Sequence, residues 1–229
     1  MAVFDLQVQE GDSVMKKGCV SLWLAALVAA MALVQASAWA EENQGQAAGA
    51  KENTRMGDRT HVTISTITFE LPDPGEDVPR FTKAQNLEKA RALLDVAGER
   101  SSDIVCLPEL FNTKRTADQR EAEEIPGGET SDLLSEMAAK WRMYVMGCYY
   151  EKAGDKVYNS VALFGRDGGH MGTYHKVHLP PGESDYATPG DGFPVFETDF
   201  GKVGALVCID IHFPEAARSL ALAGADIVF

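Results

Sequence analysis

Three side chains of the kinds used in nucleophilic catalysis each follow a separate predicted strand of this sequence. Glu109 comes shortly after IVCL, Lys176 lies in GTYHKVHLPPGE, and Cys208 follows GALV and precedes IDIHFPE. A desolvated carboxylate can act as a general base, and a fixed ammonium can stabilise an oxyanion. At a strand-to-helix turn, the helix N-terminus favours a thiolate, and its free N–H groups can bind an oxyanion. Alone, each residue is more often structural, but together they indicate a Cys–Glu–Lys nucleophilic site.

A metal site is not expected, although two histidines flank Lys176. His175 and His178 lie three residues apart at a predicted strand end, so their side chains point to opposite faces. The sequence offers no further ligand set with the spacing of a zinc site.

The elements that would position these residues alternate between strands and helices, which predicts an α/β fold. The close succession of strands in the middle of the chain indicates antiparallel pairs, so a purely parallel doubly wound sheet is disfavoured. Hydrophobic periodicity gives the boundaries. The predicted strands cover about 61–69, 103–107, 143–151, 157–165, 170–176, 202–209 and 225–229, and the predicted helices cover 81–100, 130–141 and 214–223.

The composition is that of a globular and acidic protein. The chain has 229 residues, of which 45% are hydrophobic and 24% are charged, and its formal net charge is −13. Such a surface repels phosphate backbones, so we expect no nucleic-acid partner. Four cysteines are too few for a disulfide-dense scaffold, and we expect Cys106 and Cys148 to be buried free thiols.

The N-terminal segment has the pattern of a secretory signal. Lys16 and Lys17 precede an apolar run over 19–34, and small residues lead to a cleavage site after Ala40. We therefore expect a secreted or periplasmic protein with no stable membrane span after cleavage. The alternative is an uncleaved signal that anchors the chain in the membrane. Met15, directly before the two lysines, is the expected first residue of the protein. The polar residues 41–60 predict a flexible linker.

Three segments of the chain resemble the signatures of the nitrilase superfamily, the carbon–nitrogen hydrolases. They are PELF around Glu109, YHKVHLPPGE around Lys176 and CIDIHFPE around Cys208, in the order of the family. The similarity covers about 61–229, the predicted hydrolase domain. It implies a four-layer α-β-β-α sandwich, usually paired through a helical face, with Cys208 as nucleophile, Glu109 as base and Lys176 as oxyanion stabiliser. It implies no metal or organic cofactor.

The same resemblance assigns the surrounding residues. Glu183, in GESDYATPGD, matches a second glutamate and is expected to position substrate and transfer protons. The backbone N–H of Ile209 is a natural second oxyanion donor. The aromatic side chains of Phe111 and Tyr186 are candidates to line the pocket. His212 stands where many relatives have Arg, which makes a carbamoyl amino acid less certain as substrate, unless this position only packs the helix start.

The function implied by the resemblance is hydrolysis of a small amide or N-carbamoyl compound through a Cys thioester. A nitrile is a less favoured substrate, because true nitrilases tend to carry Trp and Glu after the nucleophile, whereas this chain has Ile209 and Asp210. Relatives continue past the ADIVF strand, so the domain is expected to be incomplete at its C-terminal end. A full-length form is expected to be a homo-oligomer. The rival interpretation is an inactive remnant that acts at most as a binding module.

Overall fold

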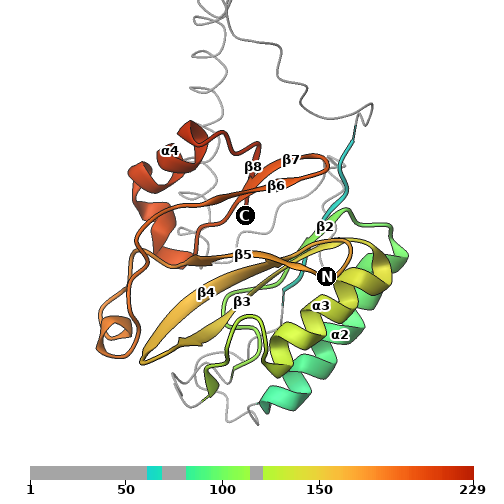
Figure 1. Ribbon diagram of the computed structural model, residues 1–229, viewed down its shortest axis with the longest axis horizontal. Coiled ribbons are helices and arrows are strands. Elements are labelled where there is room, and N and C mark those ends of the chain that lie inside the picture. Colours follow the sequence, from blue (N-terminus) through green and yellow to red (C-terminus); the bar gives the residue numbers. More distant parts are fainter. Residues whose placement is uncertain (1–60, 69–80, 114–120) are drawn as a thin grey trace, which may run out of the picture. The chain divides into compact units, whose positions relative to one another are not determined.

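The computed structural model describes residues 61–68, 81–113 and 121–229 (Figure 1). The predicted secretory signal, the possible start at Met15 and the linker over 41–60 lie outside these ranges. None of the helices within them combines the length and the apolar character that a membrane span requires.

The larger sheet has five strands in the order β1-β2-β3-β4-β5. Strands β1, β2 and β3 are parallel to one another, whereas β4 is antiparallel to both β3 and β5. Strand β5 therefore runs in the direction of β2, and the carboxyl ends of these two strands lie at the same edge of the sheet. The bounds are β1 Ile64–Thr66, β2 Ile104–Cys106, β3 Tyr144–Ala153, β4 Lys156–Phe164 and β5 His170–His175.

Two helices, α2 (Lys83–Glu99) and α3 (Glu129–Trp141), cover one face of this sheet (Figure 1). Thr82 caps the start of helix α2: its hydroxyl accepts from the backbone N–H of Gln85, and the side chain of Gln85 accepts from the backbone N–H of Thr82. Apolar side chains with helical spacing face the sheet because burying them releases water from apolar surface. Their core cluster with the sheet includes Leu87, Leu94, Leu134, Met137, Val145, Tyr149 and Phe164.

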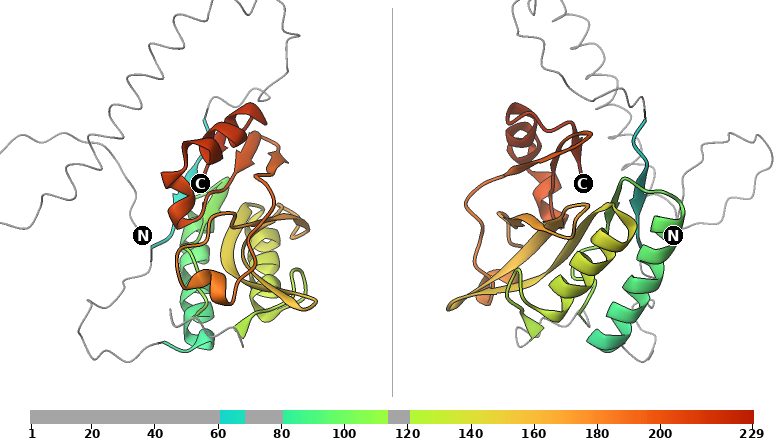
Figure 2. Two further views of the ribbon diagram at one scale, coloured as in Figure 1. Left: turned by 90° about the vertical axis from the view of Figure 1, so that its left-hand side faces the viewer. Right: turned by 45° about the vertical axis from the view of Figure 1, so that its right-hand side comes forward.

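A second sheet covers the other face, and helix α4 (Pro214–Leu222) packs on it through Ala216 and Leu220 (Figure 2). It consists of β6 (Val195–Thr198), β7 (Gly201–Gly204) and β8 (Ile227–Val228), with β7 in the middle. The core between the sheets includes Met146, Leu163, Tyr174, Phe196 and Val203. The order helices, sheet, sheet, helix confirms the predicted α-β-β-α sandwich.

Several strands are shorter than predicted, and the largest differences concern two of them. The strand expected over 61–69 covers only Ile64–Thr66, and the one expected over 202–209 ends at Gly204. The second difference arises because the backbone N–H of Val207 donates to the side chain of Asp210 (2.9 Å) and a 3-10 turn, η3 (Cys208–His212), begins directly afterwards. The sequence prediction also missed β6, which is only four residues long.

All three cysteines of the described residues are free thiols, as predicted for the two on strands. Cys106 on β2 lies opposite Met146 of β3, so Cys148 stands two residues farther along the neighbouring strand. Burial raises the pKa of Cys106 to about 11, and it raises that of Cys148 still further. Both side chains therefore remain protonated at neutral pH.

Candidate active site

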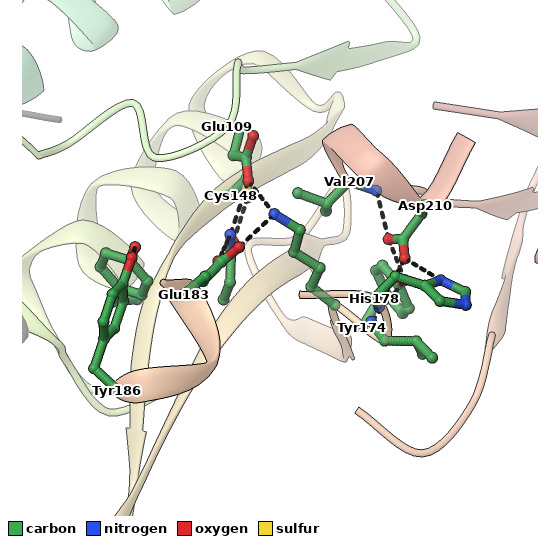
Figure 3. Close-up of polar contacts among 12 residues, drawn as sticks. Glu109, Cys148, Tyr174, His178, Glu183, Tyr186, Val207 and Asp210 are labelled. Carbon is green, nitrogen blue, oxygen red and sulfur yellow. Dashed lines mark hydrogen bonds and ion pairs between the residues drawn. The ribbon is translucent and has the colours of Figure 1, made fainter. Parts of the chain in front are cut away.

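Lys176 is a buried ammonium at the carboxyl end of β5, with a side chain only 1% exposed. Its Nζ donates to Oε1 of Glu109 (2.9 Å) and to Oε2 of Glu183 (2.8 Å). Burial by itself would lower the pKa of Lys176, but the hydrogen bonds to Glu183 and Glu109 outweigh it, and the pKa is raised above its ordinary value. The structure thus holds a permanent positive charge between the two carboxylates predicted from the sequence (Figure 3).

The two glutamates reach Lys176 from different elements. Glu109 lies in the turn after β2, where Leu110 has a positive φ of 54°, and β2 ends at the same edge of the sheet as β5. Glu183 begins the short 3-10 turn η2 (Glu183–Asp185). The side chain of Glu183 is 7% exposed and that of Glu109 is 31% exposed. Glu109 is therefore the carboxylate that a molecule from solvent can reach.

Asn159 also joins this cluster, and the sequence analysis missed it. It lies on β4 and donates from Nδ2 to Oε1 of Glu109 (2.8 Å) and to Oε1 of Glu183 (2.7 Å). Its own Oδ1 accepts from the thiol of Cys148 (3.2 Å). The available signal was a polar residue inside the apolar strand VYNSVALF, because a polar group buried in a strand requires partners.

Cys208 is exposed at the first position of η3 and has a positive φ of 51°. A residue with a Cβ atom is strained in this left-handed conformation. The structure therefore presents the thiol at a sharp turn between strand β7 and helix α4, where the sequence predicted a strand-to-helix turn. Its Sγ has no hydrogen bond to Glu109 or Lys176, whose described contacts are those above.

Asp210 fastens the turn of Cys208 to the strand end that carries Lys176. Its carboxylate is 0% exposed and accepts from the hydroxyl of Tyr174 (2.6 Å), from the backbone N–H of His178 (3.0 Å) and from that of Val207 (2.9 Å). The imidazole Nδ1 of His178 lies 2.8 Å from the same carboxylate. Tyr174 and His178 stand two residues on either side of Lys176. The hydrogen bonds of Asp210 thus join the turn to the backbone on both sides of Lys176, beside the separate set of bonds made by the ammonium (Figure 3).

The remaining predicted site residues are spread over different environments. Ile209 is half-buried and follows Cys208 in η3, while His212 is exposed at the end of that turn. Tyr186 lies directly after η2, and its hydroxyl lies 3.0 Å from that of Tyr150. The side chain of Phe111 is buried in the core under the helices, where its ring packs against that of Tyr149.

The two histidines beside Lys176 each have a carboxylate partner. Nε2 of His175 lies 2.7 Å from Glu151, whereas His178 belongs to the Asp210 unit. Over 61–68, 81–113 and 121–229, no group of three or more His, Cys, Asp or Glu side chains is arranged to hold a metal ion.

Replacing Gly190 by alanine is expected to destabilise the fold at this site. A Cβ at Gly190 would lie 2.1 Å from the carbonyl oxygen of His175, and the backbone N–H of Gly190 donates to the carbonyl of Lys176 (2.9 Å). Because backbone must move to relieve this clash, we expect a loss of about 1–3 kcal/mol in urea unfolding. Gly192→Ala is the control, since a Cβ there meets nothing within 4 Å. Equal stability of the two variants would show that the backbone around Gly190 moves without cost and would contradict this prediction.

The model of the carbon–nitrogen hydrolase family matches residues 74–229 of the chain. Among curated proteins, the chain is similar to a nitrilase of Pyrococcus abyssi, with 41% identity over 150 residues, covering 63% of this chain and 57% of the relative. It is also similar to the N-carbamoylputrescine amidase of Solanum lycopersicum, with 33% identity over 179 residues, covering 73% of this chain and 57% of the relative.

Among solved structures, the fold is similar to that of a carbon–nitrogen hydrolase from Helicobacter pylori G27. The TM-score is 0.62 at 29% sequence identity, and the match covers 73% of this chain and 58% of the other. The match therefore extends over somewhat more than half the length of each of these three proteins.

Proposed function

Because the chain belongs to the carbon–nitrogen hydrolase family, we propose that it acts as a thiol-dependent amidase on a small amide or N-carbamoyl compound. The observation that carries this proposal is the ammonium of Lys176, buried between two carboxylates beside the turn of an exposed thiol. A fixed positive charge at this position suits an oxyanion that forms when a thiolate attacks a carbonyl.

In the proposed reaction, Cys208 attacks the carbonyl carbon while Glu109 accepts the thiol proton. The ammonium of Lys176 and the backbone N–H of Ile209 stabilise the tetrahedral oxyanion. The carbon–nitrogen bond then breaks, and Glu109 returns its proton to the leaving amine. Water attacks the resulting thioester, Glu109 accepts a proton from it, and the returning proton restores the thiol as the acid leaves.

The free oxygen of Glu109 supports its assignment as the base. Both its hydrogen bonds, from Lys176 and Asn159, go to Oε1, and Oε2 has no hydrogen-bond partner among the described residues. Glu183, in contrast, has both oxygens bonded, one to each of the same two donors. We therefore propose that Glu183 positions the ammonium and that proton transfer belongs to Glu109 alone. The family resemblance implied both substrate positioning and proton transfer for Glu183, whereas this proposal assigns Glu183 no proton transfer.

A nitrile is the second candidate substrate, and the relative named nitrilase at 41% identity favours it. The similarity to an N-carbamoylputrescine amidase favours the first candidate. We place the amide and carbamoyl classes first because Ile209 and Asp210 stand where true nitrilases tend to carry Trp and Glu. Tyr186 and His212 are proposed to contact the part of the substrate remote from the bond that breaks.

The experiment that tests the proposal offers the protein an amide, an N-carbamoyl amine and a nitrile of matched size. Release of ammonia is measured together with the mass of the peptide that contains Cys208. We expect ammonia from the first two compounds and an acyl adduct on Cys208 in quenched samples. Turnover of the nitrile alone would establish the second candidate. Ammonia without any adduct on Cys208, or no turnover of the three, would contradict the proposed function.

We also propose that the chain is exported, as its N-terminal pattern predicts, and that a full-length form is a homo-oligomer, as the family resemblance implies. Exposed apolar side chains on η3 and α4, among them Ile211 and Leu222, support the assembly because self-association would bury them. Light scattering of the purified protein checks this, and a monomeric mass at micromolar concentration would contradict it.

A further inference from the structure

One buried amide connects the two carboxylates of the proposed active site. Asn159 is 0% exposed, and its Nδ2 donates to Oε1 of Glu109 (2.8 Å) and Oε1 of Glu183 (2.7 Å). Lys176 donates to the same two side chains, to Glu109 at 2.9 Å and to Glu183 at 2.8 Å. The four groups therefore form a closed ring in which both donors hold both acceptors.

This ring gives the two carboxylates different chemical roles. In Glu109 both donors bond Oε1, and among the described residues Oε2 has no hydrogen-bond partner on a side chain that is 31% exposed. In Glu183 the amide bonds Oε1 and the ammonium bonds Oε2, and the side chain is buried. Without the amide, Glu109 would be held only by the ammonium and could rotate its free oxygen away.

The thiol of Cys148 supports the orientation of the amide. An asparagine side chain can turn its oxygen and nitrogen end for end, and only one orientation directs two N–H groups at the carboxylates, which can only accept. The thiol of Cys148 donates to Oδ1 at 3.2 Å and stabilises that same orientation. Burial and the nearby carboxylate of Glu109 raise the pKa of Cys148, so the thiol remains a donor at neutral pH.

We propose that Asn159, oriented by the thiol of Cys148, is a positioning residue that leaves Glu109 with a free, correctly directed oxygen to serve as the base. The inference rests on the proposed function and adds to it two residues that lie outside the three family signatures. Neither residue is proposed to touch the substrate, because each acts through Glu109.

The test compares four single variants of the whole chain. Asn159→Ala should lower kcat by about 100-fold while KM changes less than about threefold, because positioning of a base acts on the chemical step. Cys148→Ala should lower kcat by about three- to tenfold, since the amide loses the donor that orients it. Cys148→Ser should restore most of this loss, because a hydroxyl also donates to Oδ1. A purely packing role predicts the reverse order, since a hydroxyl fits an apolar site worse than a methyl group.

The matched control is Ser160→Ala on the same strand. Ser160 is also fully buried and donates one hydrogen bond, to Glu151 at 2.7 Å, outside the ring. The Ser160→Ala variant should lose about as much stability as Asn159→Ala and keep the kcat of the unchanged protein. A second readout needs no substrate: alkylation of Cys208 by iodoacetamide, followed by mass spectrometry, should be several-fold slower in Asn159→Ala than in the unchanged protein.

The outcomes separate this inference from the proposed function. If the unchanged protein forms the Cys208 adduct and Asn159→Ala keeps both kcat and the alkylation rate within about threefold, the positioning role is wrong and the proposed function stands. If the unchanged protein turns over nothing, the proposed function is wrong, and the alkylation rate alone decides the positioning role. An equal loss in Cys148→Ala and Cys148→Ser would also overturn the part assigned to Cys148.

Discussion

Replacing Cys208 by alanine is expected to abolish turnover and leave the fold intact. Removing the nucleophile of a concerted catalytic group costs about 10⁴-fold or more in kcat. Cys208 is exposed at the start of η3, so its side chain contributes little to the core. We therefore expect the free energy of unfolding to change by less than about 1 kcal/mol. Residual activity within tenfold of the unchanged protein would show that another group attacks the substrate.

The glycine variant at the same position separates activity from stability. The φ of 51° at Cys208 is a strained conformation for any residue with a Cβ atom, and alanine keeps that strain. Glycine removes it, so Cys208→Gly should be inactive yet more stable than Cys208→Ala by roughly 0.5–1 kcal/mol. Urea unfolding of the two variants measures the difference. A glycine variant that is less stable than the alanine variant would mean that the turn is not strained.

The strand ends were predictable because they are marked locally. Glu109 follows the apolar run IVCL and Lys176 follows a predicted strand, and a polar residue at the end of a strand meets the edge of the sheet. The contact between Glu109 and Lys176 also requires β2 and β5 to run in the same direction, which the sequence of neither segment indicates. The family resemblance supplied that topology, and the structure shows it as hydrogen bonds between Lys176 and both glutamates.

The partners of these residues could not be predicted, because they depend on register. Asn159 reaches the ring because the backbone N–H of Lys176 donates to its carbonyl (2.9 Å), which fixes β4 beside β5. A shift of one residue would turn its side chain to the helix-covered face. The role of Asp210 could not be predicted either, since no local sequence pattern indicates that Tyr174 and His178 donate to its carboxylate.

The predicted strand over 202–209 shows how such a partner changes local structure. After Lys202, the run VGALVCI has no charged residue and no proline before Cys208, so its apolar character favours a strand to its end. The carboxylate of Asp210 takes the N–H of Val207 and starts the turn earlier. At the ring of Asn159 and at the turn of Cys208, a side chain from elsewhere in the chain therefore decides a structure that the local pattern does not predict.

Replacing Lys176 by methionine is expected to remove both turnover and much of the stability. Methionine matches the length of the side chain and removes its charge. The variant leaves Glu183 and Glu109 beside each other without their shared cation, and breaking a buried ion pair costs about 3–5 kcal/mol. Because Glu109 is 31% exposed, we expect the lower end, about 3 kcal/mol, in urea unfolding. Loss of the oxyanion stabiliser should lower kcat by about 10²–10³-fold.

The pH dependence distinguishes this electrostatic cause from simple loss of packing. The pKa of Lys176 is raised, so its stabilisation is fully present below its ordinary pKa of about 10.4 and is lost only as the pH rises beyond its raised value in the folded protein. The stability difference between the unchanged protein and Lys176→Met should therefore be constant from neutral pH up to about 10.4 and shrink as the pH rises beyond that value. Lys156→Met, at an exposed site on β4, is the control and should change stability by less than about 0.5 kcal/mol across this pH range. A difference that stays constant with pH would assign the loss to packing and would contradict the role of the buried charge.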